Sequence, residues 1–115
     1  DIEYTGGLSE TLKIYTNAEA AGIETITHMG GNTAWGQHFA MSMPESSLAE
    51  WFMHTNVGQP LGDRLLPGVS IPENGTVMPS DAPGFGLEIP EDWIVPWEHG
   101  NQVRVTYLSP KDSVR

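Results

Sequence analysis

The sequence predicts an α/β fold in which parallel strands alternate with helices. Its apolar patterns follow the order strand, helix, strand, helix, strand over residues 1–53, with short connections, as in βαβ units of a parallel sheet or barrel. Fewer than three complete units are present, so a closed barrel would need several more from elsewhere. Residues 57–100 are rich in Pro and Gly and contain few core-forming runs. We therefore expect this second half to lie against a partner surface.

The first two predicted elements are the end of a strand and a helix. Residues 1–5 indicate a strand, because Ile2 and Tyr4 alternate with acidic residues. The helix should begin at Ser9 as N-cap and end at Gly22, which is a favourable residue just beyond a helix. Its apolar face would contain Leu12, Ile14, Tyr15, Ala18 and Ala21.

A second strand, helix and strand are predicted to follow. Residues 23–28 alternate Ile with Thr, and β-branched side chains favour strands. After Gly30-Gly31, Asn32 or Thr33 can cap a helix that Pro44 ends. The apolar face of that helix would contain Trp35, Phe39 and Met43. Residues 48–53 are apolar apart from one glutamate, as in a buried parallel strand.

Turn signals dominate the second half of the chain. Residues 65–71 are apolar but contain a Pro-Gly pair, and Asn74-Gly75 is the pair that favours a tight hairpin turn. Residues 87–89 and 103–108 could each form one more strand.

Charge and composition exclude several classes of function. The formal net charge is −10 with only five Lys and Arg, which argues against binding to nucleic acid or an anionic membrane. The chain has no Cys, and therefore no disulfide, zinc–thiolate site or cysteine nucleophile. This composition fits a cytoplasmic protein, and no apolar run reaches the roughly 18 residues needed to span a bilayer.

His28 is the first candidate for chemistry. Imidazole has an unperturbed pKa near neutrality and is the side chain most often used for proton transfer. Asp1 ends the preceding predicted strand, so its carboxylate could lie beside the imidazole, orient it and stabilise its charged form. A purely structural histidine at a strand end is the alternative.

Glu50 is the second candidate, because it interrupts an apolar strand. A buried carboxylate there costs free energy unless it is paired or protonated. It could be a carboxylic acid that donates a hydrogen bond to a substrate carboxylate as negative charge develops. Alternatively, it could be exposed on an edge strand or paired with a basic residue.

The other histidines carry weaker signals. His38 lies in a predicted helix between Trp35 and Phe39, where a core or interface role is expected. His54 and His99 fall in loop-like sequence without a partner at metal-ligand spacing. No HExxH or GxGxxG motif is present.

Several motifs together resemble the C-terminal third of an enolase-superfamily enzyme of the mandelate racemase and muconate lactonizing type, within its acid-sugar dehydratases. They are D-x-x-x-x-GG-L-S before a helix, ITH, GN-x-x-x-x-QH, AEWF and PSDAPGFGLEI. The similarity extends to about Trp93, and PGFGLE is its most specific part.

This resemblance implies a fold and a role for each candidate residue. Residues 1–56 would supply the last strands and helices of a modified TIM barrel, (β/α)₇β, and residues 57–115 a C-terminal segment that returns to an α+β capping domain. Asp1 and His28 would form the acid/base dyad, and Glu50 would contact the substrate carboxylate and its enediolate. Met29 and Phe52 would be pocket contacts.

The resemblance also implies a reaction and its partners. The enzyme would be a hydro-lyase that removes the α-proton of an aldonate or aldarate and eliminates water, giving a 2-keto-3-deoxy acid. Mg²⁺ would bind to carboxylates on earlier strands that these 115 residues lack. We therefore expect a fragment that is active only with the N-terminal remainder of the enzyme, and the complete enzyme to be a homo-oligomer. A racemase, epimerase or cycloisomerase of the same superfamily, or a non-catalytic binding module, remains an alternative.

Overall fold

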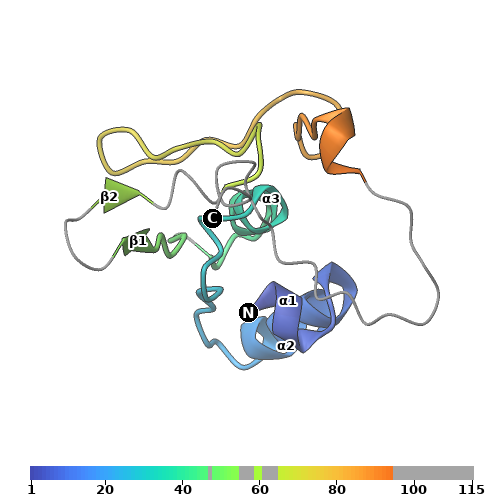
Figure 1. Cartoon of the computed structure of the whole chain (residues 1–115). Coiled ribbons are helices and arrows are strands. Elements are labelled where there is room, and N and C mark those ends of the chain that lie inside the picture. Colours follow the sequence, from blue (N-terminus) through green and yellow to red (C-terminus); the bar gives the residue numbers. More distant parts are fainter. Residues whose placement is uncertain (47, 55–58, 61–64, 95–115) are drawn as a thin grey trace.

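The computed structural model describes residues 1–46, 48–54, 59–60 and 65–94. Figure 1 shows α1 and α2 side by side, with α3 between them and the extended chain of residues 65–90. None of the helices in these ranges is long and apolar enough to cross a lipid bilayer. The elements are α1 (Ile2–Thr5), α2 (Leu8–Ala20), α3 (Ala34–Ser42), β1 (Met53–His54), β2 (Gln59–Pro60) and a 3-10 helix (Glu91–Trp93).

The strand predicted at residues 1–5 is wrong, because this segment forms the short helix α1. Asp1 is its N-cap, and its Oδ1 accepts hydrogen bonds from the backbone N–H of Glu3 at 3.0 Å and of Tyr4 at 3.3 Å. Gly6 ends the helix in the left-handed conformation. In the helix, the Asp1 side chain satisfies these two N–H groups. In a strand, the carbonyl groups of a neighbouring strand would have to do so.

The helix predicted next is confirmed as α2, but its first residue was misplaced. Gly7 occupies the N-cap position and Ser9 lies inside the helix. The predicted end is correct: Gly22 has φ +67°, its N–H donates to the Glu19 carbonyl, and the Ile23 N–H donates to the Ala18 carbonyl. These two bonds form a Schellman motif, which satisfies the last carbonyls of the helix.

The next predicted helix is confirmed as α3. Thr33 caps it by accepting a hydrogen bond from the Gly36 N–H at 3.2 Å, which decides between the two predicted caps. At its other end Met43 is extended, as expected for a residue that precedes proline.

The parallel strands predicted at residues 23–28 and 48–53 do not form in the described residues. One backbone hydrogen bond joins the two regions, from the Gly31 N–H to the Glu50 carbonyl at 2.7 Å. In the described part of the chain the strands are β1 and β2, which pair antiparallel with Met53 opposite Pro60. Strands need neighbours along their whole length to satisfy their backbone groups, and these segments have too few.

A small core joins the three helices. Ile2, Tyr15 and Phe39 are buried together, and the rings of Tyr15 and Phe39 meet edge to face with centroids 6.0 Å apart. Burial raises the pKa of the Tyr15 hydroxyl, so it stays protonated and donates to Glu19 Oε1 at 3.2 Å. Many large hydrophobic side chains remain exposed, among them Tyr4, Ile14, Ile23, Met41 and Ile94.

The hairpin turn predicted at Asn74-Gly75 is confirmed. Both residues have positive φ, and Glu73 and Thr76 exchange two backbone hydrogen bonds of 2.8 and 3.0 Å. The strand predicted at residues 87–89 does not form; one bond from the Glu88 N–H to the Pro67 carbonyl ties this segment to the chain before the turn. The strand predicted at residues 103–108 lies outside the described residues.

Candidate active site

The imidazole of His28 lies between two carboxylates. Its Nδ1 is 3.1 Å from Glu50 Oε2, and its Nε2 is 4.0 Å from Asp1 Oδ2. The structure therefore brings together the three residues that the sequence singled out. Glu50 is the nearer partner, whereas Asp1 lies beyond direct hydrogen-bonding distance.

The orientation of the Asp1 carboxylate is set by helix α1. Its Oδ1 accepts the two N–H bonds at the start of the helix, which leaves Oδ2 on the side of His28. The Asp1 side chain is only 15% exposed. Asp1 thus has one oxygen engaged in capping and the other facing the imidazole.

Glu50 is held by a backbone group as well as by the imidazole. Its Oε2 accepts a hydrogen bond from the Met29 N–H at 2.7 Å. The side chain is 42% exposed, so the burial predicted from the apolar strand is wrong. Because residues 48–53 do not form a buried strand, the carboxylate projects to the surface, where water helps to solvate it.

A pair of tight turns presents His28 and Met29. The Gly30 N–H donates to the Thr27 carbonyl at 3.0 Å, and the Asn32 N–H donates to the Met29 carbonyl at 2.9 Å. Met29 has φ +55°, a left-handed conformation that residues other than glycine rarely adopt because of their Cβ atom. This backbone strain is the kind that gathers at functional sites.

Asn32 fixes the segment that carries Phe52. Its Oδ1 accepts from the Phe52 N–H at 2.6 Å, and its Nδ2 donates to the Phe52 carbonyl at 3.1 Å. The buried amide thereby satisfies both backbone groups of Phe52, as a neighbouring strand would in a sheet. Phe52 packs edge to face against His28, with ring centroids 5.1 Å apart. Sequence reasoning considered Asn32 only as a helix cap and missed this role.

We expect Asn32→Ala to lower the free energy of unfolding by about 1 kcal/mol or more, because both backbone groups of Phe52 lose their partner. Urea unfolding of the chain bound to its complement would measure it. Asn17→Ala, on the exposed side of α2, is the matched control and should not destabilise the protein. Equal unfolding free energies for the two variants would contradict this role of Asn32.

Gln37 connects the site to the second half of the chain. Its side chain is almost completely buried, and Nε2 donates to the Gly31 carbonyl and to the Ser70 carbonyl, both at 2.7 Å. The sequence contained a signal, since a glutamine among the buried residues of α3 needs partners. The structure shows that these partners are the carbonyl groups of Gly31 and Ser70.

A cavity of about 390 Å³ adjoins the site. Trp35 and Glu3 both line it, and the Trp35 Nε1 donates to Glu3 Oε1 at 2.7 Å. The described residues around the cavity come from α1, from the turns after His28 and from the chain after residue 64; they are Asp1, Glu3, Tyr4, Met29, Asn32, Thr33, Trp35, Leu65, Leu66 and Val69.

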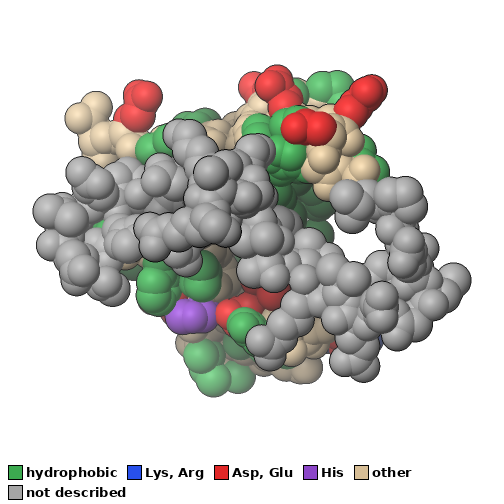
Figure 2. Space-filling view, in the orientation of Figure 1, with side chains coloured by type: hydrophobic (Ala, Val, Ile, Leu, Met, Phe, Trp, Pro, Cys, Tyr) green, Lys and Arg blue, Asp and Glu red, His purple; other side chains and the backbone are tan. Residues whose placement is uncertain are grey.

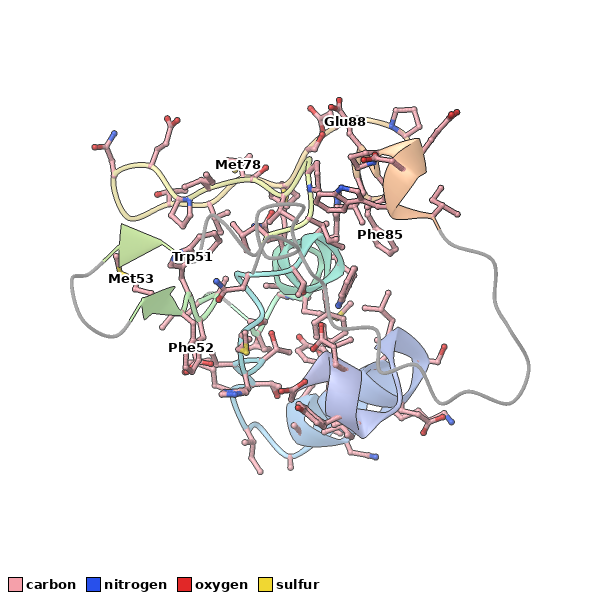
Figure 3. All side chains as sticks on the ribbon, in the orientation of Figure 1. Trp51, Phe52, Met53, Met78, Phe85 and Glu88 are labelled. Carbon is pink, nitrogen blue, oxygen red and sulfur yellow. The ribbon has the colours of Figure 1, made fainter. Side chains whose placement is uncertain are left out.

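The other histidines lie outside this site. His38 is half-buried on α3, its ring tilted against Phe85 with centroids 5.7 Å apart, in agreement with the predicted structural role. Figure 3 shows Phe85 beside α3. His54 belongs to β1, and His99 is outside the described residues.

Negative charge surrounds His28. The side chains of Asp1 and Glu50 face it, Glu3 lines the adjoining cavity, and Figure 2 shows histidine flanked by acidic and hydrophobic side chains. Lys13 is the only Lys or Arg in the described ranges, and it pairs with Glu10 at 2.6 Å. Within those ranges no group of three or more His, Cys, Asp or Glu side chains could hold a metal ion.

Residues 1–93 match the family described as "Enolase C-terminal domain-like". Among curated proteins, the chain is 35% identical over 98 residues to a protein of Caldivirga maquilingensis named "Putative L-rhamnonate dehydratase". The match covers 83% of this chain and 24% of that protein, so the chain spans about a quarter of the length of this relative. No solved structure matches the chain.

Proposed function

Because the chain belongs to the enolase C-terminal domain-like family, we propose that it forms the C-terminal part of an acid-sugar dehydratase. The observation that carries the proposal is the imidazole of His28 between Glu50 and Asp1. The name of the relative supports a sugar acid as substrate and makes L-rhamnonate the first compound to test.

His28 would move the protons of the reaction. In this proposal it takes the proton from the carbon next to the substrate carboxylate, and the electron pair of the C–H bond passes into an enediolate. Collapse of the enediolate expels the hydroxyl on the next carbon; the imidazolium of His28 gives its proton to that hydroxyl, which leaves as water, and the resulting enol takes a proton from solvent on the carbon that lost the hydroxyl and becomes a 2-keto-3-deoxy acid. The positive charge that the ring gains on taking the proton would lie between the carboxylates of Glu50 and Asp1.

Glu50 would face the substrate carboxylate. Its carboxyl group is partly exposed and held on one oxygen by the Met29 N–H, so the group is positioned before substrate arrives. In this proposal Glu50 hydrogen-bonds to the substrate carboxylate, and to the enediolate formed from it, through a proton that the two groups share. Phe52, packed on His28, and Met29 would border the substrate.

The remainder of the enzyme would complete both the fold and the charge balance. Exposed apolar side chains such as Ile23 and Ile26 suit coverage by the missing strands and helices of a (β/α)₇β barrel, with residues 1–56 as its last part and 57–115 as the segment that reaches the capping domain. An anionic substrate beside these carboxylates needs positive charge, and the one Lys in the described residues is paired with Glu10 instead. Enolase-superfamily enzymes generally use Mg²⁺. We place its ligands in the N-terminal remainder.

The test is reconstitution. The chain is mixed with the N-terminal part of the enzyme and Mg²⁺, supplied with a panel of aldonates that includes L-rhamnonate, and formation of 2-keto acid is followed. We expect product from the mixture and none from either part alone. A stable, correctly assembled complex that converts no member of the panel would contradict the proposal.

The same mixture distinguishes a racemase or epimerase, which shares proton removal but keeps the hydroxyl. In D₂O that enzyme would exchange the α-proton of the substrate and release no 2-keto acid. A dehydratase would instead give a keto acid labelled at the carbon that lost the hydroxyl.

A further inference from the structure

The carboxylate of Asp1 is oriented by a single turn of helix. Its Oδ1 accepts from the N–H groups of Glu3 and Tyr4, so the position of this turn determines where Oδ2 points. Oδ2 is 4.0 Å from His28 Nε2, already beyond the length of a hydrogen bond. The attraction between two charges falls as they separate, so a small outward movement of α1 would weaken the effect of Asp1 on the imidazole.

The indole of Trp35 holds this turn from the side of α3. Its Nε1 donates to Glu3 Oε1 at 2.7 Å, across 32 residues of the sequence. A bond to a carboxylate at this distance is charge-assisted and stronger than one between neutral groups. The indole is itself fixed, because it packs against the buried core and meets the ring of Phe85 with centroids 6.4 Å apart. Trp35 therefore restrains the otherwise exposed Glu3 and, through it, the start of α1.

Helix α1 has two further attachments. Ile2 is buried in the core, and the hydroxyls of Thr5 and Thr11 lie 2.8 Å apart at the end of the helix away from Asp1. Apolar burial is not directional, whereas a hydrogen bond specifies both a distance and a direction. The bond to Trp35 is thus suited to set the rotation of α1 at the end that carries Asp1.

We propose that Trp35 and Glu3 are positioning residues for Asp1, and that their hydrogen bond keeps the Asp1 carboxylate directed at His28. The inference rests on the proposed function and deepens it, because both residues act on the imidazole only through Asp1. A misplacement of 1 Å can cost about 100-fold in rate. Since the core also holds α1, we expect loss of the bond to lower kcat by about 3- to 10-fold and to change KM little.

The first test separates the hydrogen bond from the charge. Glu3→Gln and Glu3→Met both remove the charge at similar side-chain length, but only Gln keeps an oxygen that can accept from the indole. On the reconstituted enzyme we expect Glu3→Met to lose activity and Glu3→Gln to retain most of it. Trp35→Phe keeps an aromatic ring without the N–H and should behave like Glu3→Met. Trp93→Phe, in the 3-10 helix and outside the cavity, is the matched control and should leave kcat unchanged.

A double-mutant cycle distinguishes positioning from a loss of stability. Asp1→Asn keeps an oxygen to cap α1 but lacks the carboxylate that faces His28. If Trp35 acts through Asp1, Trp35→Phe lowers the rate of α-proton exchange in the original protein and not in Asp1→Asn. Incomplete folding would lower the rate by the same factor in both proteins. Equal factors, or equal losses in Glu3→Gln and Glu3→Met, would overturn the proposal.

A second measurement does not depend on turnover. The ring NMR signals of His28, identified by their absence in His28→Asn, report the surroundings of the imidazole. In the complex we expect Glu3→Met to shift these signals and Glu3→Gln to leave them in place. Identical signals in the two variants would overturn the positioning role. Absence of keto acid from every aldonate would instead count against the proposed function, and the NMR comparison would still decide the role of Trp35 and Glu3.

Discussion

Replacing His28 by Asn is expected to lower kcat of the reconstituted enzyme by about 10²- to 10⁴-fold, the usual contribution of a positioned acid or base. An amide cannot accept and return a proton near neutral pH. Asn can still donate a hydrogen bond toward Glu50, so the surrounding turn should keep its structure. The loss should appear in 2-keto acid formation with every active substrate and in exchange of the α-proton with D₂O.

His38→Asn is the matched control for this experiment. His38 lies on α3 against Phe85 and does not contact Asp1, His28 or Glu50 in the structure. We expect its activity to remain within a few-fold of the unmodified enzyme. A folded His28→Asn complex with full activity would contradict the assignment of His28 as the proton-transfer residue.

Gly36→Ala is expected to destabilise the protein by about 1–3 kcal/mol, the usual cost of overpacking. A change from glycine to alanine inside a helix normally stabilises a protein by up to about 1 kcal/mol. At position 36 we expect the opposite effect on the free energy of unfolding. The reason is close packing: a Cβ at Gly36 would collide with the Gly30 carbonyl oxygen and come within 2.7 Å of Thr33 Oγ1.

The collision would also displace the turn that carries His28, so we expect activity to fall together with stability. Urea unfolding and keto acid formation on the same preparation would measure both. Asn17→Ala, at an exposed position of α2, is the control for helix propensity and should be neutral or stabilising. A Gly36→Ala protein more stable than the original would contradict the close packing.

Local sequence signals predicted the elements that local forces determine. Thr33 and Gly22 mark helix ends through hydrogen bonds within a few residues, and Asn74-Gly75 closes a turn between adjacent residues. The predicted strands depended instead on distant neighbours. Without such partners residues 1–5 formed a helix around the Asp1 cap, and residues 23–28 and 48–53 stayed irregular.

The members of the candidate site could be chosen from chemistry, but their arrangement could not. Asp1, His28 and Glu50 stand out because their side chains transfer protons or carry charge. No pattern in the sequence indicates that Glu50 is nearer to the imidazole than Asp1, or that the buried amide of Asn32 holds Phe52. Those facts depend on turns and distances that span about 20 residues of the chain.

The Gln37 amide has only two N–H groups, and each is given to a different half of the chain: one to Gly31 and one to Ser70. If the segment around Ser70 were displaced, a donor would be left unsatisfied in a buried position, and Gly31 adjoins the turn that presents His28. Docking of the segment around Ser70 and ordering of the turn that presents His28 are therefore thermodynamically linked. A form of the chain in which the segment around Ser70 is not docked would therefore hold the imidazole of His28 less firmly.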